Sequence, residues 1–161
     1  MNFRVGNGID VHQLIKNKEL ILGGIHIPSE IGIDGHSDGD ALLHALTDSI
    51  LGALALGDIG DYFPSNDSNW ENADSKIFLN FSLDEMRKKN YYISNLDITI
   101  ILQKPAISKY KNKIRNHLSK YLSIDISQIS IKATTTDKLG FIGSSKGICV
   151  ISNILLISNE H

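Results

Sequence analysis

The segment from about Gly39 to Leu56 constrains the fold of this chain more than any other, because it is apolar on most of the circumference that a helix would present. A helix that is apolar all round is buried in a core or between subunits, so other elements must surround it. We expect it to stop near Gly57 and to be capped at its start by Ser37 or Asp38. Its apolar residues are Ala41, Leu42, Leu43, Ala45, Leu46, Ile50, Leu51, Ala53, Leu54 and Ala55.

The rest of the sequence provides elements that can cover this helix. Apolar and β-branched runs bounded by turn residues predict strands, and amphipathic runs predict helices. Strands and helices alternate after residue 30, so we expect an α+β fold (α/β two-layer) with helices packed on one face of a mixed β-sheet. The expected strands are Phe3–Ile9, Leu20–Leu22, Ile25–Ile27, Leu96–Leu102, Ser130–Ala133 and Gly147–Ile157; the expected helices are Ala73–Lys89 and Ser108–Leu122; the expected loops are Gly32–Gly39 and Gly57–Asn72.

Length and composition limit the class of protein. The 161 residues fit a single domain, residues 1–161. A formal net charge of −2 argues against a general nucleic-acid binder. The one cysteine, Cys149, excludes an internal disulfide and fits the reducing cytoplasm. Met1–Gly8 holds no apolar run with a cleavage signature, and no run of about 18 uncharged apolar residues occurs, so we expect neither a leader nor a membrane span.

Asp10, His12 and His44 are candidate metal ligands. On an extended chain, residues i and i+2 point to the same face, so Asp10 and His12 can bind one ion. Two imidazoles and one carboxylate suit zinc, and three protein ligands leave a fourth position open for chemistry. Spacing alone does not select this set, because His36 or Asp38 could replace any of the three, and an Asp-x-His pair also arises by chance.

His44 stands out because it lies on the single polar stripe of the apolar helix. Asp40, His44 and Asp48 are four residues apart and share one helical face. A histidine between two acidic residues is costly to bury unless its polar atoms are satisfied. We therefore expect Asp40 or Asp48 to orient the imidazole ring as an outer partner of the metal site.

Thr134, Thr135 and Thr136 follow an expected strand and are candidates for phosphate binding. Their hydroxyl and backbone N–H groups, with Lys138, can donate to phosphate oxygens. Asp137 could reach a phosphate through a divalent cation. The alternative is that the threonines only favour β structure. A further turn, residues 58–61, has carboxylates that could bind hydroxyl groups or merely shape the turn.

Four motifs in this chain resemble one enzyme family. They are GIDVHQL at 8–14, HSDGDALLHALTDSILGALALGDIGDYFP at 36–64, ADSK at 73–76 and IKATTTDKLGFIG at 131–143. Together they resemble the 2-C-methyl-D-erythritol 2,4-cyclodiphosphate synthases of the non-mevalonate isoprenoid route, over about residues 4–157. The resemblance implies a homotrimer with active sites between subunits. It also implies release of CMP from 4-diphosphocytidyl-2-C-methyl-D-erythritol 2-phosphate as the 2-phosphate attacks the β-phosphate.

The resemblance also implies the role of each site residue. Asp10, His12 and His44 would bind zinc, Asp137 would hold magnesium or manganese through the substrate phosphates, and His36 and Thr135 would be catalytic. The implied substrate-binding residues are Asp10, His12, His36, Ser37, Asp58, Ile59, Gly60, Phe63, Ser65, Asp67, Leu102, Ala106, Thr134, Thr135, Thr136, Asp137, Phe141 and Ser144. No nucleic acid or membrane is an implied partner.

The chain departs from the family pattern at several of these positions. Asp137 replaces a usual Glu, Ala106 a common Lys and Ser65 a common Asp. Ser144 and Ile151 replace an Arg and a Glu that form a basic site on the trimer axis in some members, so we expect that site to be weak or absent here. The competing readings of the residues are a zinc phosphoesterase that uses a metal-bound water and a non-catalytic trimer with a structural metal.

Overall fold

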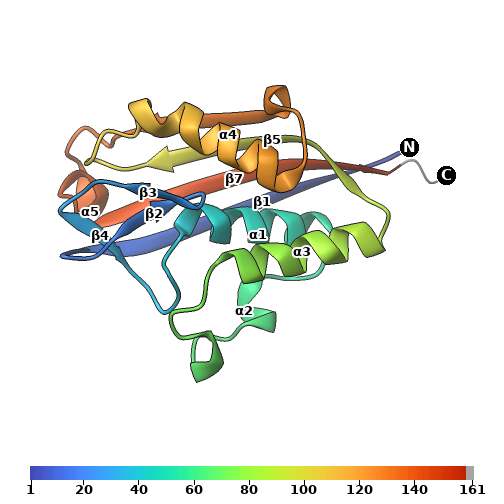
Figure 1. Ribbon diagram of the computed structural model, residues 1–161, viewed down its shortest axis with the longest axis horizontal. Coiled ribbons are helices and arrows are strands. Elements are labelled where there is room, and N and C mark those ends of the chain that lie inside the picture. Colours follow the sequence, from blue (N-terminus) through green and yellow to red (C-terminus); the bar gives the residue numbers. More distant parts are fainter. Residues whose placement is uncertain (159–161) are drawn as a thin grey trace.

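A computed structural model describes residues 1–158 and shows a twisted sheet with helices layered against it (Figure 1). Within these residues the main sheet has the strand order β4-β1-β7-β5-β6. Its strands are β1 (Asn2–Lys16), β4 (Ile31–Asp34), β5 (Tyr92–Ile101), β6 (Ile129–Thr134) and β7 (Gly147–Ser158). Because β5 and β6 run parallel while the other neighbours are antiparallel, the sheet is mixed, as predicted.

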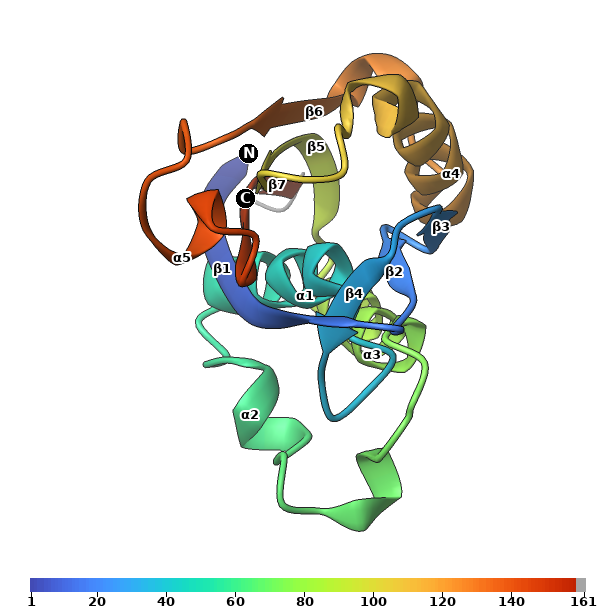
Figure 2. The ribbon, with the colours of Figure 1, turned by 90° about the vertical axis from the view of Figure 1, so that its left-hand side faces the viewer.

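The long helices lie on one face of this sheet, which confirms the expected two-layer arrangement (Figure 2). They are α1 (Ala41–Ala53), α3 (Lys76–Lys88) and α4 (Lys111–Leu122). The two-stranded hairpin of β2 (Leu20–Leu22) and β3 (Ile25–Ile27) is also as predicted. Shorter elements are α2 (Ile59–Tyr62), α5 (Gly140–Gly143) and three 3-10 turns, η1 (Ser68–Trp70), η2 (Ser108–Tyr110) and η3 (Ile126–Gln128).

Helix α1 is the centre of the core. Its apolar side chains are buried against β1 and β7 on one side and α3 on the other, as its all-round apolar sequence requires. The strands alternate: Ile148, Val150 and Ile154 of β7 face the helices and are buried. The outward residues of β1 are apolar and exposed in the single chain, with Val5 at 75% and Ile9 at 56%.

Three expectations about the chain around α1 are wrong. Residues 32–34 belong to β4, and the segment 57–72 contains α2 and η1 instead of being a continuous loop. The N-cap is neither Ser37 nor Asp38 but Asp40, whose Oδ1 accepts from the backbone N–H of Leu43 at 3.0 Å. The helix starts later because Gly39, with φ of +71°, turns the chain just before it.

The structure also bears on the expected absence of a membrane span. Among residues 1–158, no helix combines the length and the apolar character needed to cross a bilayer.

Candidate metal centre

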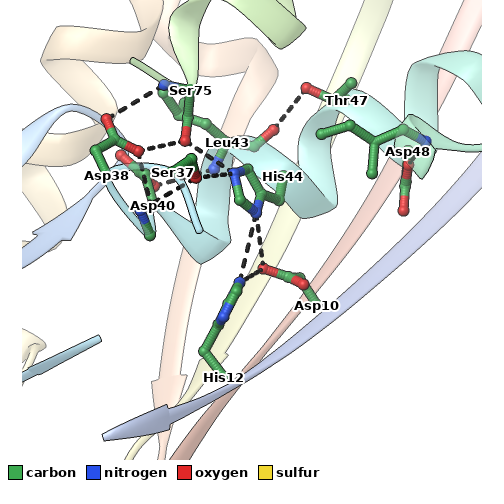
Figure 3. Close-up of polar contacts among 12 residues, drawn as sticks. Asp10, His12, Ser37, Asp38, Asp40, Leu43, His44, Thr47, Asp48 and Ser75 are labelled. Atoms are coloured by element: carbon green, nitrogen blue, oxygen red, sulfur yellow. Dashed lines mark hydrogen bonds and ion pairs between the residues drawn. The ribbon is translucent and has the colours of Figure 1, made fainter. Parts of the chain in front are cut away.

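Asp10, His12 and His44 meet at the contact between β1 and α1 (Figure 3). The two strand residues are on the inner face of β1, and His44 is in the first turns of α1. Oδ2 of Asp10 lies 2.8 Å from Nε2 of His12 and 3.3 Å from Nδ1 of His44. The two ring nitrogens are 3.5 Å apart. Of the candidate sets that spacing left open, the structure brings together this one.

Two glycines allow the helix to lie so close to the strand. A Cβ atom on Gly6 would be 1.7 Å from the carbonyl oxygen of Ser49, and one on Gly8 would be 1.9 Å from that of Ala45. No other residue fits at either position, since contacts this short are forbidden. The bare strand backbone therefore sets the distance at which His44 faces Asp10.

The electrostatics of the cluster favour a bound cation. Oδ2 of Asp10 is buried and accepts no hydrogen bond of normal geometry. Burial raises the pKa of Asp10, but the interactions with His12 and His44 outweigh it and lower the pKa to about 2. Burial lowers the pKa of His12, but Asp10 and then Asp34 outweigh that effect and raise it, so a metal ion at His12 has to displace a proton. A carboxylate that stays ionised beside two imidazoles is a typical zinc-ligand set.

The spacing of the donor atoms fits a single tetrahedral ion. Zinc–ligand bonds of about 2.0–2.2 Å place tetrahedral ligands about 3.3–3.6 Å from one another. The Asp10–His44 and His12–His44 distances of 3.3 and 3.5 Å lie in that range, while the Asp10–His12 distance of 2.8 Å is shorter. With three protein ligands, the fourth position is open to a substrate oxygen or to water.

The outer partners of His44 are serines, so the expectation that Asp40 or Asp48 orients the ring is wrong. Nε2 of His44 lies 2.9 Å from Oγ of Ser75 and 3.1 Å from Oγ of Ser37. Asp40 is turned to the glycine turn of the hairpin, where its oxygens accept from Gly23 and Gly24 at 2.9 and 2.7 Å. Asp48 accepts from the backbone of Ile59 at 2.8 Å.

Asp38 lies one step further from His44, as the partner of Ser75, and residue spacing did not reveal this contact. Its carboxylate contacts the hydroxyl of Ser75, and its Oδ2 accepts from the backbone N–H of Ser75 at 3.2 Å. Asp38 is therefore a partner of Ser75 and not a metal ligand. The ADSK motif contains Ser75, but nothing in its spacing indicated a contact with His44.

A cavity of about 230 Å³ opens beside the metal cluster. His36, also a candidate ligand from spacing, lines this cavity and is not part of the cluster. Of the implied substrate residues, those that line it are His12, His36, Ser37, Ile59, Gly60, Phe63 and Ser65.

Asp58 and Asp67 are absent from its lining and instead cap α2 and η1 through their side chains. Trp70 and Phe78 were not anticipated as lining residues; their rings contact Phe63 at centroid distances of 4.9 and 4.8 Å.

A second cavity collects other implied substrate residues. Its lining consists of Leu102, Gln103, Ala106, Ile107, Ser108, Ala133, Thr134 and Thr135, and it shares none of them with the cavity beside the metal cluster. The adjoining loop is held internally: the backbone N–H of Asp137 donates to Oγ1 of Thr135 at 3.2 Å. Thr136 donates to the carbonyl of Leu139 at 2.7 Å.

Phe141 and Ser144, the remaining implied residues, lie in and just after α5 and line neither cavity. Both are exposed, and Oγ of Ser144 donates to the carbonyl of Phe141 at 3.2 Å. Each single chain therefore presents two separate cavities, one beside the Asp10–His12–His44 cluster and one beside the loop that carries Thr134, Thr135 and Thr136.

Comparison with known sequences identifies a family. A sequence model of the YgbB family matches residues 3–157. The 2-C-methyl-D-erythritol 2,4-cyclodiphosphate synthase of Brachyspira hyodysenteriae is 53% identical over 147 residues, which are 91% of this chain and 93% of that protein. The synthase of the same name from Clostridium perfringens is 51% identical over 154 residues, covering 96% of this chain and 99% of its own.

Solved structures agree with the sequence match. A CDP complex of IspF from Plasmodium falciparum superposes with a TM-score of 0.86 at 43% identity, covering 99% of this chain and 98% of that one. The bifunctional IspDF of Campylobacter jejuni gives a TM-score of 0.92 at 41% identity; the match covers 96% of this chain and 42% of that longer one.

Proposed function

The chain belongs to the YgbB family, and we propose that it converts 4-diphosphocytidyl-2-C-methyl-D-erythritol 2-phosphate into 2-C-methyl-D-erythritol 2,4-cyclodiphosphate and CMP. This is a phosphorus–oxygen lyase step of the non-mevalonate isoprenoid pathway. The observation that carries the proposal is the Asp10–His12–His44 cluster beside a cavity lined by His36 and Ser37. Relatives named 2-C-methyl-D-erythritol 2,4-cyclodiphosphate synthase match nearly the full chain.

The reaction is an intramolecular displacement at phosphorus. An oxygen of the 2-phosphate forms a bond to the β-phosphorus, and the bond from that phosphorus to the oxygen shared with the α-phosphate breaks, so that CMP leaves. The nucleophile is already an anionic phosphate oxygen, so no strong base is needed. The enzyme has to align two anions and reduce their repulsion.

In this proposal each cavity is one half of an active site. The first half-site is the cavity beside Asp10, His12 and His44, and its residues suit the part of the substrate that carries the 2-phosphate. Asp10, His12 and His44 would hold a zinc ion, which when bound supplies positive charge that lowers the repulsion between phosphates. His36 and Ser37, at the rim of the same cavity, would donate hydrogen bonds to the phosphates. The apolar wall formed by Phe63 fits the methylerythritol carbons.

The residues of the second half-site suit the cytidine diphosphate. Leu102 and Ala106 would enclose the base in the cavity beside the threonine loop. Thr134, Thr135 and Thr136 would donate to the diphosphate, with Thr135 supporting the transition state. Asp137, exposed in the same loop, would hold magnesium or manganese together with the phosphates.

We further propose that the two half-sites meet between neighbouring subunits of a homotrimer. Support comes from the separate lining of the two cavities and from the outer face of β1, where Phe3, Val5, Ile9 and Val11 are all at least 50% exposed in the single chain. Exposed apolar patches of this kind mark interaction surfaces. The single cysteine, Cys149, is consistent with a cytoplasmic location.

The test is to incubate the purified protein with zinc, magnesium and the diphosphocytidyl substrate. CMP is followed by chromatography and the cyclic product by phosphorus NMR, in water labelled with ¹⁸O. We expect equal amounts of both products and no label in the cyclic diphosphate. Incorporation of ¹⁸O into a linear product would instead support a zinc phosphoesterase, and the absence of CMP would support a non-catalytic trimer.

A further inference from the structure

The imidazole of His44 is held from the side opposite to Asp10 by a buried serine, and we propose that Ser75, fixed by Asp38, is the positioning residue that prepares His44 for the metal. This inference rests on the zinc site proposed above. It concerns residues outside that site, because neither Ser75 nor Asp38 lines the cavity beside the metal cluster.

The positions of the hydrogens follow from the chemistry of the partners. Ser75 is fully buried, and its Oγ contacts Oδ1 of Asp38 (Figure 3). A carboxylate only accepts hydrogen bonds, so the serine hydroxyl donates to Asp38. The same Oγ lies 2.9 Å from Nε2 of His44. Because its own hydrogen points to Asp38, this oxygen accepts, and Nε2 of His44 carries the proton.

When Nε2 of His44 carries the proton, the other ring nitrogen, Nδ1, is unprotonated in the neutral ring. Nδ1 of a neutral His44 then has its lone pair exposed toward Oδ2 of Asp10, 3.3 Å away, and Nε2 of His12, 3.5 Å away. That lone pair is what a metal ion requires of an imidazole ligand. A hydrogen bond on the second ring nitrogen fixes both tautomer and ring orientation, and it raises the basicity of the ligand.

Ser37 contacts the same nitrogen but differs from Ser75 in its surroundings. Its Oγ lies 3.1 Å from Nε2 of His44 and accepts from the backbone N–H of Gly39 at 3.3 Å. It lines the cavity and is only half-buried. Since its hydroxyl has no carboxylate to fix it, Ser37 can turn toward substrate. We therefore assign the positioning role to Ser75.

The carboxylate that fixes Ser75 is itself held by the backbone. Oδ1 of Asp38 accepts from the N–H of Asp40 at 3.2 Å, and the N–H of Asp38 donates to the carbonyl of Ala73 at 3.0 Å. The loop before α1 and the segment before α3 are thereby clamped together. The clamp places the hydroxyl of Ser75 against a histidine that is 31 residues away in the chain.

The experiment measures zinc affinity rather than turnover. Metal-free protein, prepared with a chelator, is titrated with zinc in competition with a chromogenic chelator. We expect Ser75→Ala to weaken zinc binding by roughly 10- to 100-fold, the loss typical of removing an outer partner of a ligating histidine. The matched control is Ser82→Ala. Ser82 is an equally buried serine of α3 whose hydroxyl donates to the carbonyl of Leu79 at 2.8 Å, and its removal should leave the affinity unchanged.

A spectroscopic readout separates positioning from a general loss of structure. In zinc-loaded protein with ¹⁵N-labelled histidine, the Nε2–H proton of His44 should be visible and slow to exchange. It should be lost in Ser75→Ala and retained in Ser82→Ala. If Ser75→Ala does not fold, Asp38→Asn serves instead, because its neutral oxygen is a weaker acceptor and should weaken zinc binding to a smaller extent.

Three results would overturn the proposal. If wild-type protein binds zinc and Ser75→Ala binds it equally well, or if Ser37→Ala alone weakens binding, the positioning role of Ser75 is wrong. If wild-type protein binds no zinc, the proposed Asp10–His12–His44 metal site is wrong, and the role of Ser75 with it.

Discussion

Nε2 of His12 and Nδ1 of His44 face each other across 3.5 Å, one from a strand and the other from the helix packed on that strand. Both nitrogens also lie within 3.3 Å of the same carboxylate oxygen of Asp10. Three donor atoms this close, two neutral or cationic and one anionic, define a small volume in which a divalent cation satisfies all of them at once. The relationship predicts that each histidine is needed for metal binding.

Replacement of either histidine by alanine should abolish tight zinc binding. His44→Ala and His12→Ala each remove one of three ligands, so the loss should exceed the roughly 10- to 100-fold typical of outer partners. CMP release should fall with it. Zinc content after dialysis, measured by mass spectrometry, checks the prediction. His26→Ala is the control, since His26 is exposed on the hairpin and does not belong to the cluster. Full zinc occupancy in His44→Ala would show that the assignment is wrong.

The close approach of β1 and α1 can be tested at Gly8. In Gly8→Ala the new Cβ would lie 1.9 Å from the carbonyl oxygen of Ala45, so strand and helix must separate. We expect a destabilisation of at least the roughly 1–3 kcal/mol that overpacking costs, together with weaker zinc binding, because the ligands come from the two separated elements. Denaturant unfolding and zinc titration provide the two measurements.

Gly52→Ala is the matched control for this substitution. Gly52 is an exposed glycine near the end of α1, and a Cβ there would lie 3.7 Å from the carbonyl oxygen of Asn7, which is an ordinary van der Waals contact. Its replacement should be neutral or stabilising by about 0.5 kcal/mol, since alanine is the better helix former. Equal destabilisation by Gly8→Ala and Gly52→Ala would show that the contact at Gly8 does not set the distance between β1 and α1.

The features that could be predicted from the sequence are those that depend on the spacing of residues within one helix or one strand. The all-round apolar segment identified α1 as the buried centre, and the two-residue period of an extended chain placed Asp10 and His12 on one face. Both inferences use only neighbours along the chain. They indicated which residues are available to a metal, but left open whether His36, Asp38 or His44 completes the set.

The remaining features depend on contacts between distant segments. Gly6 and Gly8 matter only because α1 lies over them, and nothing in β1 alone says which helix approaches. Ser75 reaches His44 only because two loops are clamped together through Asp38. Asp40 looked like a partner of His44 on a helical face, but it precedes the helix and its oxygens satisfy backbone N–H groups there. Helical periodicity fails at a cap because the backbone is no longer helical.

Asp40 predicts a pH dependence of stability. Burial raises its pKa to about 6, against the hydrogen bonds from Gly24, Gly23 and Leu43. A carboxyl whose pKa is higher in the folded than in the unfolded chain stabilises the fold when protonated, and this contribution is lost as the pH rises from about 4 to about 6. The stability of wild type relative to Asp40→Asn should therefore fall by about 2–3 kcal/mol over that interval.

This measurement is made by urea unfolding of metal-free protein at several pH values. The asparagine variant is the reference because it retains the shape of the side chain but does not titrate. A relative stability that increases with pH would contradict the prediction. It would mean that the three backbone N–H groups lower the pKa of Asp40 by more than burial raises it.

Subunit mixing tests whether an active site needs two chains. His44→Ala disables the half-site with the metal cluster, and Thr135→Ala removes a hydroxyl from the half-site with the threonine loop, at a cost of roughly 100-fold in turnover for one transition-state donor. Each homotrimer should therefore be nearly inactive. In trimers assembled by co-expressing both variants in equal amounts, half of the metal half-sites and half of the loop half-sites are intact. About one quarter of all sites should combine two intact halves, and CMP release should recover to about a quarter of wild type.

Co-expression of His44→Ala with His12→Ala is the control and should recover nothing, because every metal half-site is then damaged. If purified mixed trimers of the first pair remain as inactive as their parents, the two half-sites do not meet between subunits.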